Sequence, residues 1–249
     1  MKTKTITKKV HTIVALGLIG MLSFTSCNKD ENTDSNEAIT EQEAVDEIEA
    51  SLSKESNGVS KSVETAMTTA DEDDMFTDTP SVDCGLEYQD TFIESYQVNG
   101  YSYYYAVTRN LQLNCNENEQ LNYVDYVASL NGDYETPRLI SENVTNIEWQ
   151  LADIHPNYET VTFEGLLNRE GRLQSKVRNM NNFNGSLSMN VQNLVVDKTT
   201  YQIMSGTGNV TFIGTTSTGN QFEFSGSITF NGDDTVTLVL NGNTYTIYL

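Results

Sequence analysis

The chain has 249 residues, of which 37% are hydrophobic, and its 14 Lys and Arg residues face 35 Asp and Glu residues, giving a formal net charge of −21. This balance excludes proteins that bind nucleic acid or anionic lipid through a basic surface, because an acidic chain repels phosphate groups. The length is sufficient for one domain with a substantial core.

The first 26 residues have the order of a secretory leader. Four lysines precede an apolar run from Thr12 to Phe24, and small hydroxyl residues lead into Cys27. This order is typical of a signal peptide, and the run is shorter than the ~18 apolar residues that a membrane-spanning helix needs. We expect the leader to be removed, which leaves 10 Lys and Arg against 35 Asp and Glu, a formal charge of −25, with Cys27 as the first residue.

Two short motifs carry a family resemblance. Phe24-Thr25-Ser26-Cys27 resembles the processing site of bacterial lipoproteins, although such sites usually have leucine in place of Phe24. The resemblance covers only the leader and implies that acyl chains on Cys27 hold the protein to a membrane. Lys29-Asp30-Glu31 resembles the signal that sends Bacteroidetes-type lipoproteins to the outer face of the outer membrane; an ordinary acidic linker is the alternative. Together they imply an outer-membrane lipoprotein exposed at the cell surface.

Residues 27–80 have the composition of an acidic tether. Residues 28–80 contain 16 acidic residues and three lysines, with many Ser, Thr and Asn. Such a segment buries too little apolar surface to fold by itself, so we expect a linker between the anchor and a domain. Asp71-Glu72-Asp73-Asp74 offers oxygen ligands for calcium, but no glycine-turned twelve-residue loop follows, and the linker interpretation is favoured.

One short helix is expected inside the tether, over about residues 41–53. Thr40 and Glu43 have the spacing of a capping box. Apolar residues then recur at helical spacing on one face: Val45, Ile48 and Leu52. This narrow stripe predicts docking onto the domain or a partner, or a helix that is only marginally stable alone.

Residues 81–249 have the pattern of an all-β domain. Apolar and polar residues alternate, for example from Phe222 to Phe230, which indicates antiparallel strands with one buried face. Turn-forming pairs separate such runs: Asn99-Gly100, Asn131-Gly132, Asn231-Gly232 and Asn241-Gly242. We expect ten to twelve strands in an antiparallel β-meander, arranged as a sandwich or as a curved, barrel-like sheet.

Four glycines recur at intervals of 20 or 21 residues, at positions 165, 185, 206 and 226. A glycine inside a strand is typical of a bend whose gap an aromatic ring covers. We expect bends of this kind, with chance spacing as the alternative.

The remaining cysteines predict a disulfide. With Cys27 acylated, Cys84 and Cys115 form an even pair in an oxidising compartment. A bridge would close a loop of roughly 30 residues and stabilise the fold by about 3.5–4 kcal/mol on the chain-entropy model. The mature chain has one histidine, His155, and no phosphate-binding Gly-Lys-Ser/Thr loop. We therefore expect no metal and no cofactor, and interpret His155 as a turn residue.

Tyrosines mark a candidate binding surface. Nine of the 13 lie within residues 88–134. Tyr101, Tyr103 and Tyr105 share one face of a predicted strand, and Tyr104 lies on the other. Exposed rings on a rigid sheet would form a platform for a glycan or a cell-surface protein. The alternative is that this face lines the core.

These features favour a non-catalytic binding or structural module outside the cell. One alternative is a glycan hydrolase that uses paired carboxylates, with Trp149 stacking on a sugar. The candidate carboxylates are Glu142, Glu148, Asp153, Glu159 and Glu164. A solvated acidic surface explains the same residues without chemistry. A second alternative is a scaffolding protein within the envelope, for which the tether sets the reach.

Overall fold

The computed structural model describes residues 38–77, 84–178 and 180–249, which belong to one compact unit. Its helical elements are α1 (Glu41–Leu52), the 3-10 helix η1 (Lys54–Ser56) and α2 (Val59–Glu72). Its strands are β1 (Glu87–Val98), β2 (Tyr101–Cys115), β3 (Leu121–Glu135), β4 (Leu139–Ala152), β5 (Thr160–Ser175), β6 (Asn182–Asp197), β7 (Ile203–Thr216), β8 (Gln221–Phe230), β9 (Thr235–Leu240) and β10 (Asn243–Tyr248).

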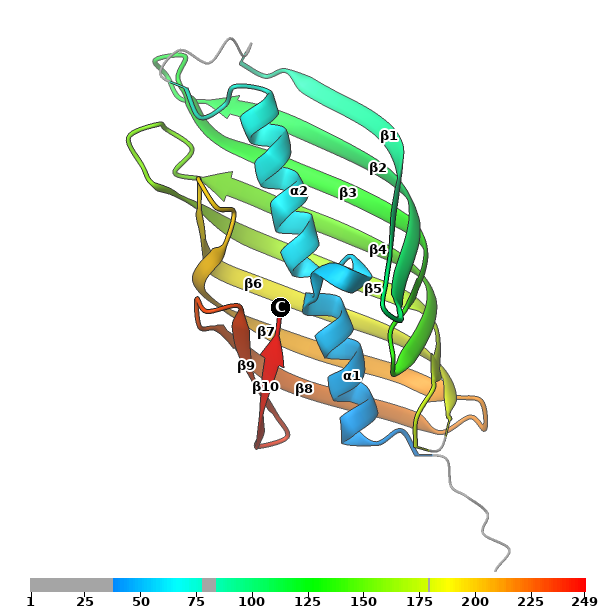
Figure 1. Ribbon diagram of the computed structural model, residues 1–249. Coiled ribbons are helices and arrows are strands. Elements are labelled where there is room, and N and C mark those ends of the chain that lie inside the picture. The colour runs from blue at the N-terminus through cyan, green and yellow to red at the C-terminus, as the bar shows by residue number, and fades with distance from the viewer. Residues whose placement is uncertain (1–37, 78–83, 179) are drawn as a thin grey trace, which may run out of the picture. The chain divides into compact units, whose positions relative to one another are not determined.

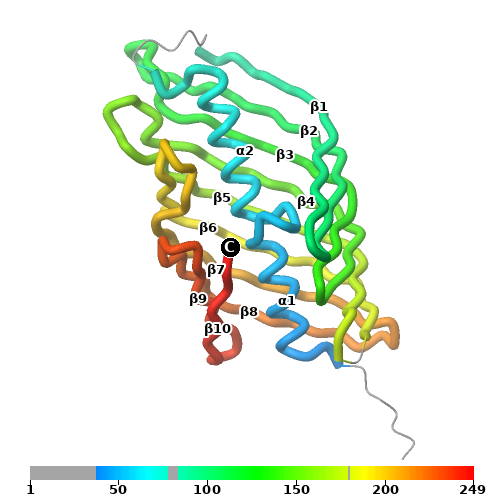
Figure 2. The backbone as a smooth tube through the Cα atoms, in the orientation of Figure 1, coloured from blue at the N-terminus to red at the C-terminus, as the bar shows by residue number. Residues whose placement is uncertain are grey.

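All ten of these strands form one antiparallel sheet whose spatial order is the chain order, which confirms the predicted meander. Among the described residues, β1 pairs only with β2 and β10 only with β9, so the sheet is open. Of the two shapes that the sequence allowed, the protein has the single curved sheet. Figures 1 and 2 show α1 and α2 lying across one face, which we call the inner face, with the last hairpin curled toward them. The opposite side is the outer face.

The core lies between the inner face and the helices. In β4, every second residue from Leu139 to Leu151 is buried, because alternate side chains of a strand point to opposite faces. Large buried side chains come from both layers: Trp149, Tyr105, Phe163 and Phe212 from the sheet, and Ile48, Leu52 and Met67 from the helices. The helices are thus part of the core.

Helix α1 begins where the sequence predicts. The backbone N–H of Glu43 donates to Thr40 Oγ1 at 3.2 Å, and the backbone N–H of Thr40 donates to Glu43 Oε2 at 2.9 Å, which completes the capping box. Ile48 and Leu52 are fully buried against the rest of the unit. The folded unit therefore includes α1 and begins well before residue 81, where the sequence predicts the start of the β domain. Within this unit, α1 packs on the sheet.

Helix α2 lies in a stretch that the composition favoured as linker. Its polar residues are mostly Ser and Thr, but Val59, Val63 and Met67 recur every four residues and are fully buried. Trp149 Nε1 donates to Ser62 Oγ at 3.2 Å and joins the first turn of α2 to β4. The apolar stripe is the signal that composition alone obscures.

Helix α1 meets the sheet through charged side chains. The side chain of Asp46 is 1% exposed and accepts hydrogen bonds from Arg138 at 3.0 Å and Arg178 at 2.6 Å. Asn181 Nδ2 donates to both carboxylate oxygens of Glu43, at 3.2 and 3.1 Å. Each carboxylate thus has donors from the loops beside the sheet, as buried charges require.

Arg169, on β5, is 3% exposed and lies under the end of α1. Its guanidinium donates to the carbonyl oxygens of Ser56 at 3.2 Å and Asn57 at 3.0 Å, and it lies 5.1 Å from the centre of the Tyr134 ring. The hydroxyl of Tyr134 donates to Glu47. Burial raises the pKa of Glu47, and the charge of Arg169 and the hydrogen bond from Tyr134 reduce that rise.

One predicted turn is wrong. Asn131-Gly132 lies inside β3, and the chain turns at residues 136–138 instead. A Cβ on Gly132 would lie 2.0 Å from the carbonyl oxygen of Tyr104, so this glycine permits a close approach of strands rather than a turn. The other three Asn-Gly pairs connect consecutive strands as predicted.

Candidate functional site

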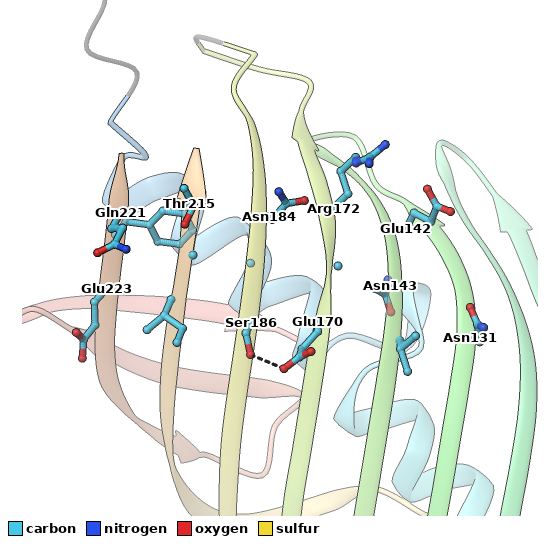
Figure 3. Close-up of a pocket in the computed structure, with 16 residues that line it drawn as sticks. Asn131, Glu142, Asn143, Glu170, Arg172, Asn184, Ser186, Thr215, Gln221 and Glu223 are labelled. Carbon is cyan, nitrogen blue, oxygen red and sulfur yellow. Dashed lines mark hydrogen bonds between the residues drawn. The ribbon is translucent and has the colours of Figure 1, made fainter. Parts of the chain in front are cut away.

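The outer face carries a shallow groove of about 1110 Å³ that crosses β3 to β8. Two rows of outward-pointing side chains flank it, and successive members of a row are partners on neighbouring strands. The first row is Glu142, Arg172, Asn184, Thr215 and Gln221, and the second is Asn131, Val144, Glu170, Ser186, Ile213 and Glu223. Figure 3 shows the polar members of both rows, with the helices behind the sheet.

A third row, of inward-pointing positions, lies between these two and explains the groove. It consists of Gly132, Asn143, Gly171, Gly185 and Gly214 on β3 to β7. A Cβ on Gly171 would lie 2.3 Å from the carbonyl oxygen of Glu142, and one on Gly214 would lie 2.1 Å from that of Asn184. Because the glycine positions carry no side chain, the sheet can bend toward its inner face along this row, and the two outer rows then spread apart.

The periodic glycines follow the expected bend in part. Gly165 and Gly185 lie under aromatic rings, those of Trp149 and Phe212, which come from neighbouring strands. The other two periodic glycines lie under leucine side chains instead. Only Gly185 belongs to the row beneath the groove, so the groove depends on the register of the strands and not on the 20-residue period.

The groove combines exposed carboxylates with an unpaired cation. Glu142, Glu170 and Glu223 are exposed, and Ser186 Oγ donates to Glu170 Oε1 at 3.2 Å. Among the Lys and Arg side chains of the described residues, Arg172 alone makes no hydrogen bond or ion pair with the protein. In a chain with a net charge of −21, this exposed guanidinium is left for solvent or a ligand.

This arrangement suits binding better than catalysis. Amide, hydroxyl, carboxylate and guanidinium groups on a rigid sheet can hydrogen-bond a ligand that is rich in hydroxyl groups. The groove carboxylates lie in the open, whereas the general acid of a glycosidase is typically enclosed by apolar side chains. In the part of the chain that the structure describes, no group of three or more His, Cys, Asp or Glu residues is placed to hold a metal ion.

The candidate tyrosines lie on the inner face. Tyr105 is 0% and Tyr103 5% exposed, and Tyr101 is half-buried, so the three rings do not form an exposed platform. Alternation establishes that they share a face but not which face is buried, and the helical layer covers this one. The hydroxyl of Tyr105 donates to Asn143 Oδ1 at 3.1 Å inside the core. The exposed ring of this strand is Tyr104, at 53%.

The residues considered for glycan hydrolysis are dispersed. Trp149 is 2% exposed on the inner face, so it is not available to stack on a sugar. Among the five candidate carboxylates, only Glu142 lines the groove. The others are exposed elsewhere: Glu148, Asp153, Glu159 and Glu164.

The cysteine prediction is confirmed where the structure describes it. Cys84 and Cys115 form a disulfide with a Cα–Cα distance of 5.6 Å, which joins the segment before β1 to the end of β2. Cys27 and the motifs around it lie outside the described residues, so acylation stays a prediction. His155 lies in the loop after β4, where its Nδ1 accepts a hydrogen bond from the backbone N–H of Asn157 at 3.2 Å.

Sequence reasoning missed most of the groove. Alternation places Arg172, Asn184 and Glu223 on the polar side of their strands, but it does not reveal that they share a surface. That requires the register of every hairpin between β3 and β8. The available signal was the set of four inward glycines, which are spaced unevenly along the chain.

No family model, curated protein or solved structure matches this chain. Within the described residues, no helix has both the length and the apolar character needed to cross a membrane. The function of the folded unit must therefore be inferred from its groove and its fold.

Proposed function

We propose that this protein is a lipid-anchored module of the outer membrane, exposed at the cell surface, that binds a glycan in the outer-face groove without catalysis. The leader and Cys27 support the anchor, and Lys29-Asp30-Glu31 supports surface exposure. The observation that carries the binding proposal is the groove itself, which extends over six strands and is lined mainly by polar side chains.

A glycan fits the chemistry of the groove. Its hydroxyl groups donate and accept hydrogen bonds, and the two rows offer both kinds of partner on either side of a backbone floor. The one aromatic residue among the groove's lining residues is Phe222, which is half-buried and packs against Phe183 and Phe212. Hydrogen bonds rather than stacking would therefore provide recognition. An extended chain of sugars would lie across the strands, between the rows.

The test uses soluble residues 28–249, which lack the leader and the acylated cysteine. Purified protein is screened on a glycan array, and hits are measured by isothermal titration calorimetry. We expect Glu142→Gln and Asn184→Ala each to weaken binding about tenfold, since loss of one hydrogen bond to a charged or planar polar group costs about 1–2 kcal/mol.

Two matched controls lie on the same strands and the same face. Glu148→Gln repeats the first change and Asn190→Ala the second, at exposed positions outside the groove. Controls that weaken binding as much as the groove variants, or an array without hits, would contradict the proposal.

Catalysis and location are tested separately. If the protein releases reducing ends from a bound glycan, and Glu142→Gln abolishes that release, the hydrolase would be favoured over the binding module. Protease shaving of intact cells tests surface exposure, and we expect the β domain to be lost. Protection until lysis would instead favour a scaffold within the envelope.

A further inference from the structure

A second pocket, of about 600 Å³, lies on the helix side of the sheet. It forms where the end of α1 and η1 meet the tip of the β1–β2 hairpin and the last residues of the chain. The first and last strands do not pair with each other, so their ends leave this space uncovered. The volume is within the ~300–1,000 Å³ range of sites for small molecules. None of its residues lines the outer-face groove.

Three tyrosines line this pocket: Tyr96, Tyr101 and Tyr248. Tyr96 is fixed in place because its ring stacks on that of Tyr103, with centroids 5.6 Å apart and planes 16° apart. Tyr101 is half-buried, and Tyr248 is 74% exposed at the rim. Tyr101 therefore lines a pocket, although it does not belong to an exposed platform. The electron-rich faces of such rings attract cations.

The charged groups of the pocket are mainly acidic. Asp46, Glu49 and Glu55 line it, with Arg138 as the one cation among its lining residues. Arg138 is already engaged, because its Nη1 lies 3.0 Å from Asp46 and 3.5 Å from Glu49. The side chain of Glu49 is still 40% exposed, so it has room for another partner. Burial raises the pKa of Glu49, Arg138 lowers it and Asp46 raises it, so a bound cation would favour the ionised form.

We propose that this pocket binds a small organic cation, an ammonium group on a compact apolar body. The tyrosine rings would surround the cationic group, and Glu49 and Glu55 would balance its charge. Anions are disfavoured by the lining carboxylates and by the net charge of the whole chain. A neutral apolar ligand would gain nothing from the charges of Glu49 and Glu55.

The test titrates choline chloride into residues 28–249 at constant ionic strength and follows backbone amide shifts by NMR. The comparison ligand is 3,3-dimethyl-1-butanol, which replaces the nitrogen of choline with carbon and has no charge. We expect saturable binding of choline, with shifts near Tyr101 and Glu49, and binding of the neutral analogue at least about tenfold weaker.

Variants separate this site from the groove. Tyr248→Leu and Glu49→Gln change exposed side chains, so folding should persist, and each is expected to weaken choline binding about fivefold. Tyr104→Leu and Glu148→Gln make the same changes on the outer face and should leave it unchanged. Arg172→Ala should affect only the groove, so either proposal can fail without the other.

Three results would overturn the inference. One is the absence of saturable shifts up to 100 mM choline, which is roughly a hundredfold above a millimolar dissociation constant. Another is equal binding of the neutral analogue. The third is equal weakening of choline binding by the pocket variants and by their outer-face counterparts.

Discussion

The two helices cross the same inner face and differ in the charged contacts that they make with it. Helix α1 is attached through buried carboxylates, with Glu43, Asp46 and Glu47 each engaging a different part of the sheet or its loops. Helix α2 is attached through apolar and small side chains, with Val63 and Met67 fully buried. Both helices bury an apolar stripe, but only α1 adds buried carboxylates with directional bonds to the sheet and its loops.

This difference separates the contacts that fix where a helix lies on the sheet from the contacts that only stabilise its docking. Apolar contacts such as those of α2 stabilise without fixing one register, because dispersion and the hydrophobic effect are not directional. The carboxylates of α1 must meet their donors, so they define where the helix lies, at the cost of desolvating charges. We therefore expect the α1 interface to respond to pH and salt, and the α2 interface to respond to side-chain volume.

The largest effect is expected from Arg169→Met. The change removes the buried cation at the centre of the α1 interface, whose charge favours ionised Glu47, and leaves the carbonyl oxygens of Ser56 and Asn57 without their donor. We therefore expect a loss of about 3–5 kcal/mol in the free energy of unfolding. Urea denaturation measures it. Arg172→Met, on the same strand but exposed, is the control and should change stability by less than about 0.5 kcal/mol. Equal losses would show that the buried network is unimportant.

Met67→Ala tests the α2 interface. We expect a loss of about 2–4 kcal/mol, from lost transfer free energy and the cavity that remains. The loss should be the same in low salt and in 0.5 M NaCl, because no charge is involved. Met204→Ala, at a 46% exposed position of β7, should have little effect. A loss that depends strongly on salt would contradict the apolar description of α2.

Asp46→Asn weakens the contacts of α1 with Arg138 and Arg178. We expect a loss of about 2 kcal/mol at low salt, which is typical of a hydrogen-bonded charge. It should shrink in 0.5 M NaCl, because both arginines are partly exposed and therefore screened. Denaturation of Asp133→Asn, an exposed carboxylate of β3, provides the baseline. A salt-independent loss would indicate that shape, not charge, matters here.

The smallest expected effect is a change in how the free energy of unfolding depends on pH. Burial raises the pKa of Glu47 above its ordinary value of 4.5, so the folded chain holds that proton more tightly than the unfolded chain. Its contribution to stability is then greatest below pH ~4.5 and declines as pH rises through the folded-state pKa. Glu47→Gln should therefore gain stability relative to the wild type between pH 4.5 and 8, as followed by thermal unfolding. A constant difference over this range would be the contrary result.

The parts of the fold that depend on local patterns could be predicted. The capping box predicted the start of α1, alternation predicted the strands, and the even pair predicted the Cys84–Cys115 disulfide. Features that depend on tertiary context could not. The buried face of Tyr103 and Tyr105 is determined by which side the helices cover, and alternation treats both sides alike.

The groove could not be predicted from local sequence patterns either, because it depends on the register of several strands. Arg172 and Asn184 are 12 residues apart and become neighbours only through the register of one hairpin, and each further strand adds another register. The turn predicted at Asn131-Gly132 was wrong because an Asn-Gly pair can form a tight turn or allow two strands to approach closely. Only the partner strand distinguishes the two uses.

The sequential strand order also determines when contacts become available during synthesis. The span between Cys84 and Cys115 consists of the β1–β2 hairpin and the short segment before it, so closing this bridge requires none of the other eight strands of the sheet. The partners of α1 arrive much later, because Glu43 and Asn181 are 138 residues apart. Helix α1 comes first among the described elements, yet its contacts with Asn181 can form only after β5 has been made.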